Sequence, residues 1–331
     1  MIDLSVIIVN WNTRDLLAQC LTSLYADVPF ASFASFETFV VDNASTDGSP
    51  AMVRERFPQV HLIANSVNEG FARANNQAIR QSRGRYVLLL NPDTEVHRGA
   101  LETLVRFMDD HPKAGAAGPR LLNADGTLQV SSQPRPTLFR EAWMLLHLDK
   151  HLRLGSYDMG RWDMAAPRRV DVVKGACLIA PRGVLFQLGL LDEDYFLYAE
   201  ELDLCARIRR AGYDVYWVPS AVVTHLGEQS TCQMPERMFL ELYVSRHRFF
   251  RKQHGWAAGL GFKLILLTAA APRIALGLLA YFRPQLQRDD WLRKARLYRH
   301  LALSVLSGQF SSAVGQRRFQ PATPSLKEKC Q

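Results

Sequence analysis

The sequence lacks the motifs that identify several common classes of nucleotide-binding and metal-binding protein. Its five cysteines contain no CxxC pair and no zinc-like spacing. Residues 10–13, Asn-Trp-Asn-Thr, stand where a dehydrogenase would carry a GxGxxG loop and where a nucleotidylyltransferase would carry a glycine-rich basic loop. No helix-turn-helix, zinc or RNP-like pattern accompanies the basic residues. The sequence therefore argues against both enzyme classes and predicts no nucleic-acid partner.

Export signals are also missing. The chain begins Met1-Ile2-Asp3 and passes directly into an apolar run, without the basic leader and small-residue cleavage site of a secretory signal. The cysteines are odd in number and scattered, which is usual in a reducing compartment. We therefore expect a cytoplasmic setting and no export.

The composition is that of a globular protein of enzyme size. The 331 residues are 48% hydrophobic and 22% charged, near the averages of soluble proteins, and only residues 320–331 have the composition of a flexible tail. The formal charge of +8 favours an anionic partner, such as a phosphorylated ligand or an acidic membrane surface.

Short apolar runs alternate with segments of helical periodicity in the first part of the chain. We expect strands at residues 4–9, 39–41, 60–64 and 86–90, and helices at residues 15–25, 72–81 and 200–211. A further helix after the turn cluster at residues 42–48 would bury Val53 and Phe57. This alternation predicts an α/β fold with a mainly parallel sheet and helices on both faces. Residues 123–169 have weaker periodicity and are interpreted as an insertion.

Polar residues follow three of the expected strands. Asn10, Asp42 and Asp93 stand at these positions, and ligands of parallel sheets bind beyond the carboxyl ends of the strands. Asp93, within Asn91-Pro92-Asp93-Thr94, would supply an oxygen ligand to a divalent cation that neutralises a diphosphate. The alternative is a turn in which Asp93 caps a following helix.

The later part of the chain holds candidates for proton transfer. Glu200, Glu201 and Asp203 begin the expected helix at residues 200–211, where acids complement the helix dipole. The apolar and aromatic residues before them would raise the proton affinity of a carboxylate toward that of a general base. His225 follows an apolar run and is a metal ligand, a phosphate donor or a structural histidine. Arg73 is a surface charge or a cation for a nucleotide.

Six segments in chain order resemble the motifs of family-2 glycosyltransferases. The first four are VIIVNWN at residues 6–12, VVDNASTDG at 40–48, NEGFARANN at 68–76 and LLNPDT at 89–94. YAEELDLC at residues 198–205, with Gly212-Tyr213, resembles the acceptor-side motif, and THLG at 224–227 resembles the closing motif. The resemblance runs from about residue 3 to 230, and rhamnosyltransferase-like members that build bacterial surface polysaccharides are the most similar.

This resemblance implies a GT-A fold, the nucleotide-diphospho-sugar transferase fold, and inversion at the anomeric carbon. It implies binding of Mg²⁺ or Mn²⁺ by Asp93, with His225 as a further ligand. The nucleotide-sugar-binding positions would be Val9, Asn10, Asn12, Asp42, Asn68, Gly70, Arg73, Asn91 and Asp93, and the acceptor-binding positions Gly175, Tyr198 and Asp203. We expect Glu201 to be the catalytic base, with Glu200 as its rival.

Two departures from the family pattern keep an alternative open. Asn91 replaces the first acid of the family's Asp-x-Asp, and Glu200-Glu201 replaces the usual Glu-Asp. A catalytically inactive sugar-nucleotide-binding homologue is therefore the alternative to an enzyme. For the donor we expect deoxythymidine diphosphate rhamnose first and a uridine diphosphate hexose second.

The C-terminal segment combines apolar runs with basic residues. Lys263 and Pro272-Arg273 divide residues 255–282 into pieces shorter than the ~20 residues of a spanning helix. Basic residues follow at positions 283, 288, 293, 294, 296 and 299. We expect this helical segment, residues 231–319, to lie on an anionic membrane surface, beside a catalytic domain at residues 1–230 and a flexible tail at 320–331. The enzyme would then be peripheral to the cytoplasmic face of the inner membrane and act on a lipid-linked saccharide; a packed helical subdomain or a homo-oligomer contact is the alternative.

Overall fold

The structure is a computed structural model that describes residues 2–27, 35–227, 229, 231–279, 285–307 and 310. Two compact units are distinguished, and each is described by itself. Unit 1 contains the described parts of residues 1–135 and 157–233, and unit 2 contains the described parts of 136–156 and 234–317. Residues 136–156, part of the expected insertion, thus belong with the C-terminal helices, which the sequence did not indicate. The expected tail at 320–331 lies outside the described residues.

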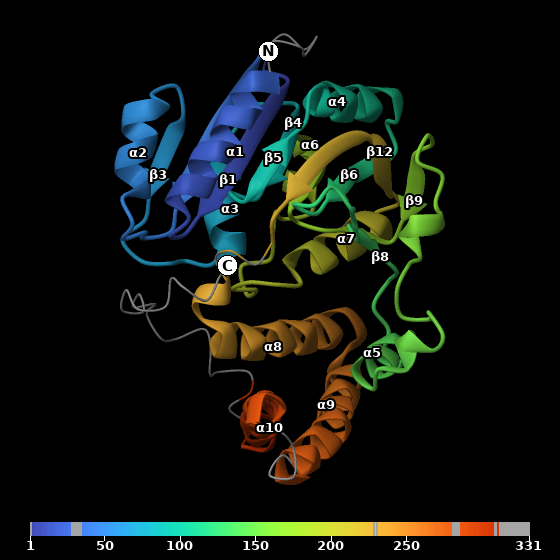
Figure 1. Cartoon of the computed structure of the whole chain (residues 1–331). Helices are drawn as coiled ribbons and strands as arrows, with labels where there is room; N and C mark the ends of the chain where they lie inside the picture. Colours follow the sequence, from blue (N-terminus) through green and yellow to red (C-terminus); the bar gives the residue numbers. More distant parts are fainter. Residues whose placement is uncertain are drawn as a thin grey trace. The chain divides into compact units, whose positions relative to one another are not determined.

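Unit 1 is built on a large sheet with an adjoining two-stranded ribbon (Figure 1). The sheet strands are β1 (Leu4–Asn10), β2 (Phe36–Asp42), β3 (His61–Ala64), β4 (Tyr86–Leu90), β5 (Thr94–Val96), β6 (Ala114–Leu122), β7 (Leu128–Gln129), β9 (Arg168–Val170), β11 (Cys177–Pro181) and β12 (Asp214–His225). The ribbon pairs β8 (Ser132–Gln133) with β10 (Val172–Val173) in antiparallel orientation.

The strand order in the sheet is β3-β2-β1-β4-β11-β6-β12-β5, with β7 beside β6 and β9 beside β12. Strands β3, β2, β1 and β4 are mutually parallel, and β6 is parallel to β12. β11 runs antiparallel between β4 and β6. The expected α/β fold with a mainly parallel sheet is confirmed, and the carboxyl ends of β1, β2 and β4 meet at one edge.

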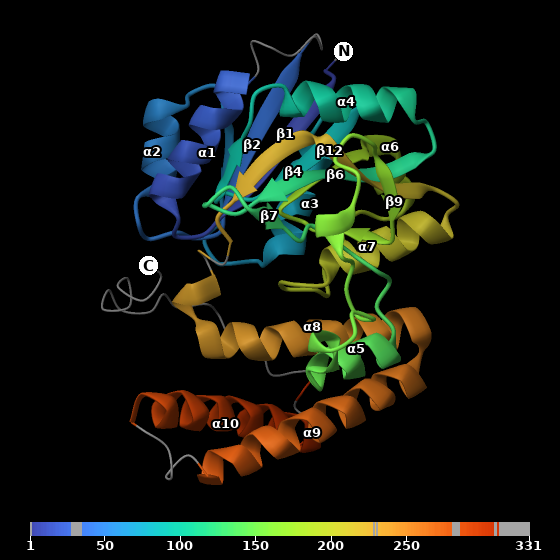
Figure 2. The same ribbon diagram turned by 45° about the vertical axis from the view of Figure 1, so that its right-hand side comes forward.

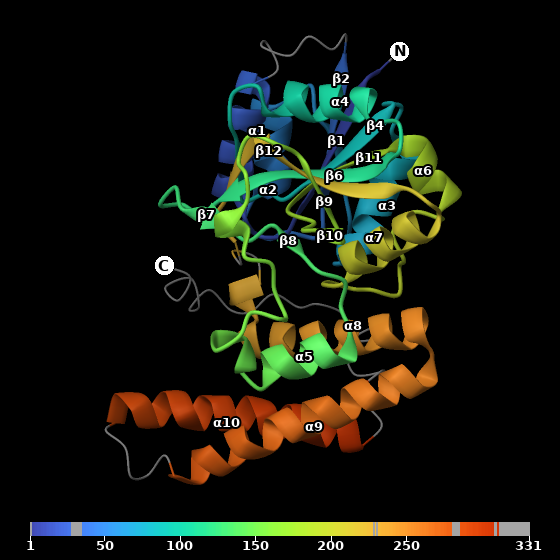
Figure 3. The same cartoon turned by 90° about the vertical axis from the view of Figure 1, so that its right-hand side faces the viewer.

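The helices of unit 1 connect these strands. They are α1 (Arg14–Asp27), α2 (Ser49–Arg56), α3 (Phe71–Gln81), α4 (Ala100–Asp110), α6 (Arg182–Gln187) and α7 (Glu200–Arg210), with 3-10 turns η3 (Met159–Arg161) and η4 (Thr231–Gln233). Alternate residues of a strand point to opposite faces. α1, α2 and α4 pack on the face that carries Leu4, Val6 and Ile8 of β1. α3 contacts β1 and β2, and α7 contacts β6 and β12, on the other face (Figure 3).

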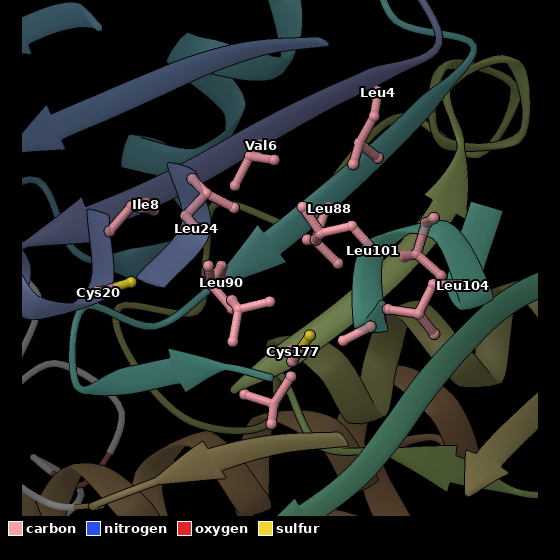
Figure 4. Close-up of a cluster of buried hydrophobic side chains, with 14 of the residues drawn as sticks. Leu4, Val6, Ile8, Cys20, Leu24, Leu88, Leu90, Leu101, Leu104 and Cys177 are labelled. Atoms are coloured by element: carbon pink, nitrogen blue, oxygen red, sulfur yellow. The ribbon is translucent and has the colours of Figure 1, made fainter. Parts of the chain in front are cut away.

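The core on the first face is almost entirely aliphatic (Figure 4). The labelled side chains are Leu4, Val6, Ile8, Cys20, Leu24, Leu88, Leu90, Leu101, Leu104 and Cys177. Each fully buried leucine here contributes roughly 1.5–3 kcal/mol by leaving water. This packing holds β1 and β4 rigidly, so the polar residues that follow them are presented by a fixed scaffold.

Unit 2 is helical (Figure 2). Its elements are α5 (Leu138–Leu145), η2 (Leu148–Lys150), α8 (Pro235–His254), α9 (Trp256–Leu278) and α10 (Gln285–Leu306). α9 contacts α5, α8 and α10. Two glycines of α9 allow close approach: a Cβ on Gly277 would lie 2.3 Å from the Cβ of Ala295, and one on Gly259 would lie 3.2 Å from His247 Nε2. An ion pair between Arg246 of α8 and buried Glu141 joins α8 to α5.

The expected division of the apolar C-terminal run is wrong. α9 is one continuous helix of 23 residues that contains Pro272 in its interior. Arg273, which was expected to help interrupt the run, donates to the carbonyl oxygens of Ala269 and of Leu145 in α5. Arg273 thus makes one bond within α9 and one to α5 next to the proline, where a backbone donor is missing. By length and composition, Trp256–Gly277 is able to cross a membrane, with a mean hydropathy of 1.5, and 28% of that window is buried.

Candidate active site

The ends of β1 and β2 are joined by a hydrogen-bonded cluster. The register places Asn10 beside Asp42, and the Asn10 amide nitrogen donates to Asp42 Oδ1 at 2.9 Å. Ser45 N donates to Asp42 Oδ2 at 2.9 Å, and Thr13 Oγ1 donates to Asn10 Oδ1 at 2.7 Å. Asn10 and Asp42 are 0% and 2% exposed, while Val9 is buried at the end of β1. Each Asp42 oxygen thus accepts a hydrogen bond from within the protein.

Asn12 shapes the loop that follows β1. Its φ is +53°, a left-handed conformation that asparagine tolerates better than most residues. Its backbone nitrogen donates to Ser45 Oγ at 2.9 Å, and its side-chain Oδ1 accepts from Thr46 N at 2.8 Å. The first two predicted motifs therefore interlock through their loops.

The loop before α3 is tied to the acceptor-side motif. Asn68 Oδ1 accepts from Gly70 N at 3.0 Å, and Phe71 N donates to the carbonyl oxygen of Phe196 at 2.7 Å. Gly70 has φ +84°, and a Cβ there would lie 2.6 Å from that same oxygen, so this position requires glycine. Arg73, half exposed, pairs with Glu69 at 3.1 Å and with Glu193 at 3.4 Å.

Asp93 and His225 meet at the ends of β4 and β12. Asp93 Oδ1 lies 3.4 Å from His225 Nε2, and the two side chains are 7% and 13% exposed. The two strand ends are held together by pairing of His225 with Thr94 across β12 and β5 and by donation from Leu226 N to the Asp93 carbonyl at 3.0 Å. Because Thr94 begins β5, the alternative in which Asp93 caps a helix is wrong.

Two amide side chains surround His225. Asn91 Nδ2 lies 3.3 Å from Nε2, and Gln129 Oε1 of β7 lies 2.8 Å from Nδ1. Gln129 Nε2 also donates to the His225 carbonyl oxygen at 3.0 Å. Beneath this site, burial raises the pKa of the Cys20 thiol to about 12, so the thiol stays protonated and donates to the Asn91 carbonyl.

The acceptor-side motif enters α7 through a strained turn. Tyr198 and Ala199 both have left-handed backbones, with φ +67° and +66°. Strain of this kind, in residues other than glycine, is concentrated at functional sites. Glu200 is buried at 5% exposure, whereas Glu201 is half-buried. A Cβ on Gly175 would lie 3.7 Å from Glu201 Cβ, so the Glu201 side chain begins close to the Gly175 turn.

The Gly175 turn also contacts the segment that contains Asp93. The next residue, Ala176, accepts from Asn91 N at 2.9 Å. The same turn thus lies near Glu201 and is bonded to the Asn91–Asp93 segment. Asp203 has a different setting, since it is 1% exposed and pairs with Arg207 at 2.6 Å. Arg207 also donates to the Leu188 carbonyl at 2.7 Å.

The structure brings together most of the predicted site residues. Asn10, Asn12 and Asp42 form one cluster; Asn91, Asp93 and His225 form a second; Gly175 and Glu201 form a third contact. No local pattern points to Gln129, because it lies 96 residues from His225 in the region of weak periodicity. Roles for all these residues in binding and catalysis stay predictions.

The ligand atoms of the second cluster, which contains Asn91, Asp93 and His225, suit a divalent cation. Among the described residues no group of three or more His, Cys, Asp or Glu could hold a metal ion. The pair supplies one carboxylate and one imidazole, and a diphosphate and water would have to complete the coordination. The two facing atoms, Oδ1 and Nε2, fit this role, and the presence of nitrogen favours Mn²⁺ over Mg²⁺.

The fold and these strand-end clusters define a glycosyltransferase of the GT-A class. The family model described as "Glycosyl transferase family 2" matches residues 5–174, and the chain belongs to this family. The predicted acceptor-side and closing motifs lie beyond that match.

Known relatives and a solved structure agree with this assignment. N-acetylglucosaminyl-diphospho-decaprenol L-rhamnosyltransferase of Mycobacterium tuberculosis is 30% identical over 274 residues, covering 76% of this chain and 86% of the relative. Low-salt glycan biosynthesis hexosyltransferase Agl10 of Haloferax volcanii is 30% identical over 219 residues, 64% of each chain. The mannosyltransferase PcManGT from Pyrobaculum calidifontis, solved with GDP-Man and Mn²⁺, shares the fold with a TM-score of 0.54 at 20% identity, covering 94% of this chain and 86% of that chain.

Proposed function

We propose that this protein is an inverting, metal-dependent glycosyltransferase that moves L-rhamnose from a nucleoside diphosphate donor to a hydroxyl of a lipid-linked saccharide. The observation that carries the proposal is the arrangement around the Gly175 turn. Glu201 lies near this turn, and the turn bonds to the segment that presents Asp93 to His225. A base and a diphosphate-binding centre are the two elements that transfer to a hydroxyl needs.

Asp93 and His225 would hold the divalent cation. When bound, the cation stabilises the charge that develops on the leaving diphosphate. Asp42 and Asn10 would contribute a rigid wall for the nucleotide, since their own contacts are made within the protein.

Glu201 would take the proton of the acceptor hydroxyl as that oxygen attacks the sugar from the face opposite the diphosphate. Its half-buried position supports this role over that of Glu200, which is buried. The left-handed turn at Tyr198 and Ala199 would fix the start of α7 and so the direction of Glu201.

The relatives support the donor and the acceptor class. The M. tuberculosis relative is named as an L-rhamnosyltransferase of a decaprenol-linked N-acetylglucosaminyl diphosphate, which supports rhamnose as the sugar and a polyprenyl-linked acceptor in surface polysaccharide synthesis. The H. volcanii relative is named as a hexosyltransferase, so a uridine diphosphate hexose is the second candidate donor.

Purified protein with a panel of nucleotide sugars, Mn²⁺ or Mg²⁺ and a short polyprenyl-diphospho-saccharide tests the proposal. We expect transfer from deoxythymidine diphosphate rhamnose, dependence on the metal, and an inverted anomeric configuration in the product by NMR. Retention of configuration would refute the mechanism. Donor binding without transfer or hydrolysis to any acceptor would instead support an inactive homologue.

We also propose that unit 2 docks on the cytoplasmic face of an anionic membrane through an apolar stripe on α9. The stripe consists of Trp256, Leu260, Leu264 and Leu276 of α9 and of Leu279, the residue that follows the helix; these side chains are 76%, 49%, 57%, 43% and 53% exposed. Among the described side chains of α9, none of the exposed ones is charged. The opposite side of the helix, including Phe262 and Leu266, is buried within unit 2.

Charge supports a peripheral position over a spanning one. Arg251 and Lys252 are exposed immediately before the stripe, and Arg296 and Arg299 are exposed on the neighbouring α10. Each basic residue near an anionic surface adds about 1 kcal/mol. If α9 crossed the bilayer, the basic residues packed near it would have to enter the hydrocarbon core, which is costly for charged side chains. If α9 lies in the interface, these residues stay in water or contact the lipid headgroups.

Flotation with vesicles of phosphatidylcholine and phosphatidylglycerol tests this docking. The wild type should float, less so in high salt, and Leu260→Glu with Leu264→Glu should remove flotation without changing donor turnover. Phe186→Glu, at a similarly exposed site in unit 1, is the matched control and should float normally. If the double variant floats like the wild type, or changes the oligomeric state by light scattering instead, the stripe is a protein contact.

A further inference from the structure

Gln129 makes two contacts with the same residue. Its Nε2 lies 3.0 Å from the His225 carbonyl oxygen, and its Oε1 lies 2.8 Å from His225 Nδ1. A second acceptor, Asn123 Oδ1, lies 2.9 Å from Nε2. The Gln129 side-chain amide therefore contacts both the backbone and the imidazole ring of His225.

The backbone contact decides which way the amide points. A carbonyl oxygen can only accept, so the end of Gln129 that faces it must be the NH₂ group. The other end is then the carbonyl oxygen Oε1, which also can only accept. The orientation of an amide is usually ambiguous, but here a main-chain atom removes the ambiguity.

The tautomer of His225 follows from this orientation. Because Oε1 accepts, Nδ1 must carry the hydrogen, and in the neutral ring Nε2 is left with its lone pair. That lone pair is directed toward Asp93 Oδ1 at 3.4 Å and is met by Asn91 Nδ2 at 3.3 Å. Asp93 Oδ1 and His225 Nε2 are then two acceptors that face each other, and Nε2 has one long contact with the Asn91 amide. A cation bound between the two atoms would remove the repulsion between their lone pairs.

We propose that Gln129 is a positioning residue that holds His225 as the Nδ1–H tautomer and keeps Nε2 available as a ligand for the divalent cation. The inference deepens the proposed function and rests on its metal centre. Partners that orient a ligating histidine through its second nitrogen are usually carboxylates or backbone carbonyls, and their loss weakens metal affinity by about 10–100-fold. Here a side-chain amide performs the task from β7.

Histidine-selective ¹⁵N NMR of the whole protein tests the tautomer directly. The His225 signals, assigned by their loss in His225→Asn, should show a protonated Nδ1 and an unprotonated Nε2. Added Mn²⁺ should broaden the Nε2 signal first. In Gln129→Met, which keeps the length of the side chain but removes both contacts, the tautomers should mix, and broadening should need about 10–100-fold more Mn²⁺.

Two further variants separate positioning from general support of the fold. Asn123→Ala removes the second acceptor of the Gln129 amide, leaves both contacts with His225, and should keep the wild-type tautomer and Mn²⁺ response. Gln133→Met, at a half-buried glutamine on β8, is the matched control and should change neither. The wild-type spectrum decides the tautomer even if Gln129→Met does not fold.

The outcomes distinguish this inference from the proposed function. A protonated Nε2 in the wild type, or unchanged Mn²⁺ broadening in folded Gln129→Met, would overturn the role of Gln129 while leaving the metal centre in place. Absence of any Mn²⁺ effect on the wild-type His225 signals would overturn the metal centre, and with it this inference.

Discussion

Asp42 and Asp93 are both buried at the ends of strands in the same sheet, yet their carboxylates meet opposite surroundings. The oxygens of Asp42 each accept a hydrogen bond, one from Asn10 and one from Ser45 N. Asp93 Oδ1 instead faces His225 Nε2, which is an acceptor in the neutral tautomer. A carboxylate satisfied by protein donors shapes a loop, whereas one that faces a second acceptor is suited to a cation.

Glu241 of α8 provides a third case within unit 2. It is 1% exposed, Ser245 Oγ donates to its Oε1 at 3.2 Å, and Oε2 has no hydrogen-bond partner among the described residues. Burial raises the pKa of this carboxyl to about 7. The three buried carboxylates thus differ in what meets their oxygens. Both oxygens of Asp42 accept from donors, Asp93 Oδ1 faces an acceptor, and Glu241 has a donor for only one oxygen, so that its burial favours the neutral form.

The largest effect should come from Asp93→Asn. Removal of the charged ligand should lower metal-dependent transfer by roughly 10²–10⁴-fold, equivalent to several kcal/mol of lost charge stabilisation. Since the substitution also replaces one of two facing acceptors with an amide that can donate, the thermal unfolding temperature should not fall. Transfer rates and unfolding of the same preparation check both parts, and full activity would remove Asp93 from the metal centre.

Glu201→Gln should follow, with an effect in the same range. Loss of a general base should lower transfer by roughly 10²–10⁴-fold while donor binding, measured by calorimetry, is retained. Glu200→Gln is the matched control at the adjacent position and should retain most of the transfer rate. If the two variants behave in the reverse manner, Glu200 is the base.

The sequence alone was sufficient to predict the site residues that stand at the ends of strands. The apolar runs predicted β1, β2 and β4 closely enough to place Asn10 and Asp42 at one edge, because parallel strands end together. The resemblance to the family suggested that His225 joins Asp93. Both predictions depend on residues that follow regular elements, whose periodicity can be read locally.

Contacts made from irregular segments could not be predicted. Gln129 lies on a two-residue strand, and its partner His225 is 96 residues away. Residues 136–156 join unit 2 through α5, although the local pattern resembles a loop. Pro272 was read as a break because it lacks a backbone donor, but bonds from Arg273 to Ala269 and to α5 hold α9 together. In each case long-range packing overrides the local signal.

The third prediction concerns Glu241. Its pKa of about 7 in the folded state exceeds the ordinary value of 4.5 for a glutamate, so the folded state binds the proton more tightly. The contribution to stability is present below about pH 4.5 and lost as pH rises through 7. At about 1.4 kcal/mol per pH unit, the loss is on the order of 3 kcal/mol. Urea unfolding of Glu241→Gln should therefore show greater stability than the wild type at pH 8 and nearly equal stability at pH 4.5.

His247, also on α8, supplies the opposite control. Burial, followed by repulsion from Lys263, lowers its pKa from 6.5 to about 4, so its contribution to stability is present above pH 6.5 and lost as pH falls toward 4. His247→Gln should remove this loss at acidic pH. A gain in Glu241→Gln that is the same at both pH values would mean that Glu241 is not held neutral by its surroundings.

The smallest effect should come from Asp42→Asn, which changes the carboxylate whose oxygens accept from protein donors. The substitution keeps shape but replaces one accepting oxygen with an NH₂ group, which must then face either the Asn10 amide nitrogen or Ser45 N, both donors in the native cluster. A buried hydrogen-bonding group left unsatisfied costs roughly 1–3 kcal/mol. We therefore expect urea unfolding to show a loss of that size for Asp42→Asn, whereas Asp93→Asn, the same chemical change at the facing-acceptor site, loses no stability. Asp47→Asn, at a less buried carboxylate in the same loop that accepts from Arg14 N and from Ser49 N and Oγ, should cost less than Asp42→Asn. If Asp42→Asn and Asp93→Asn were equally destabilising, the two carboxylates would not differ in the way that their surroundings indicate.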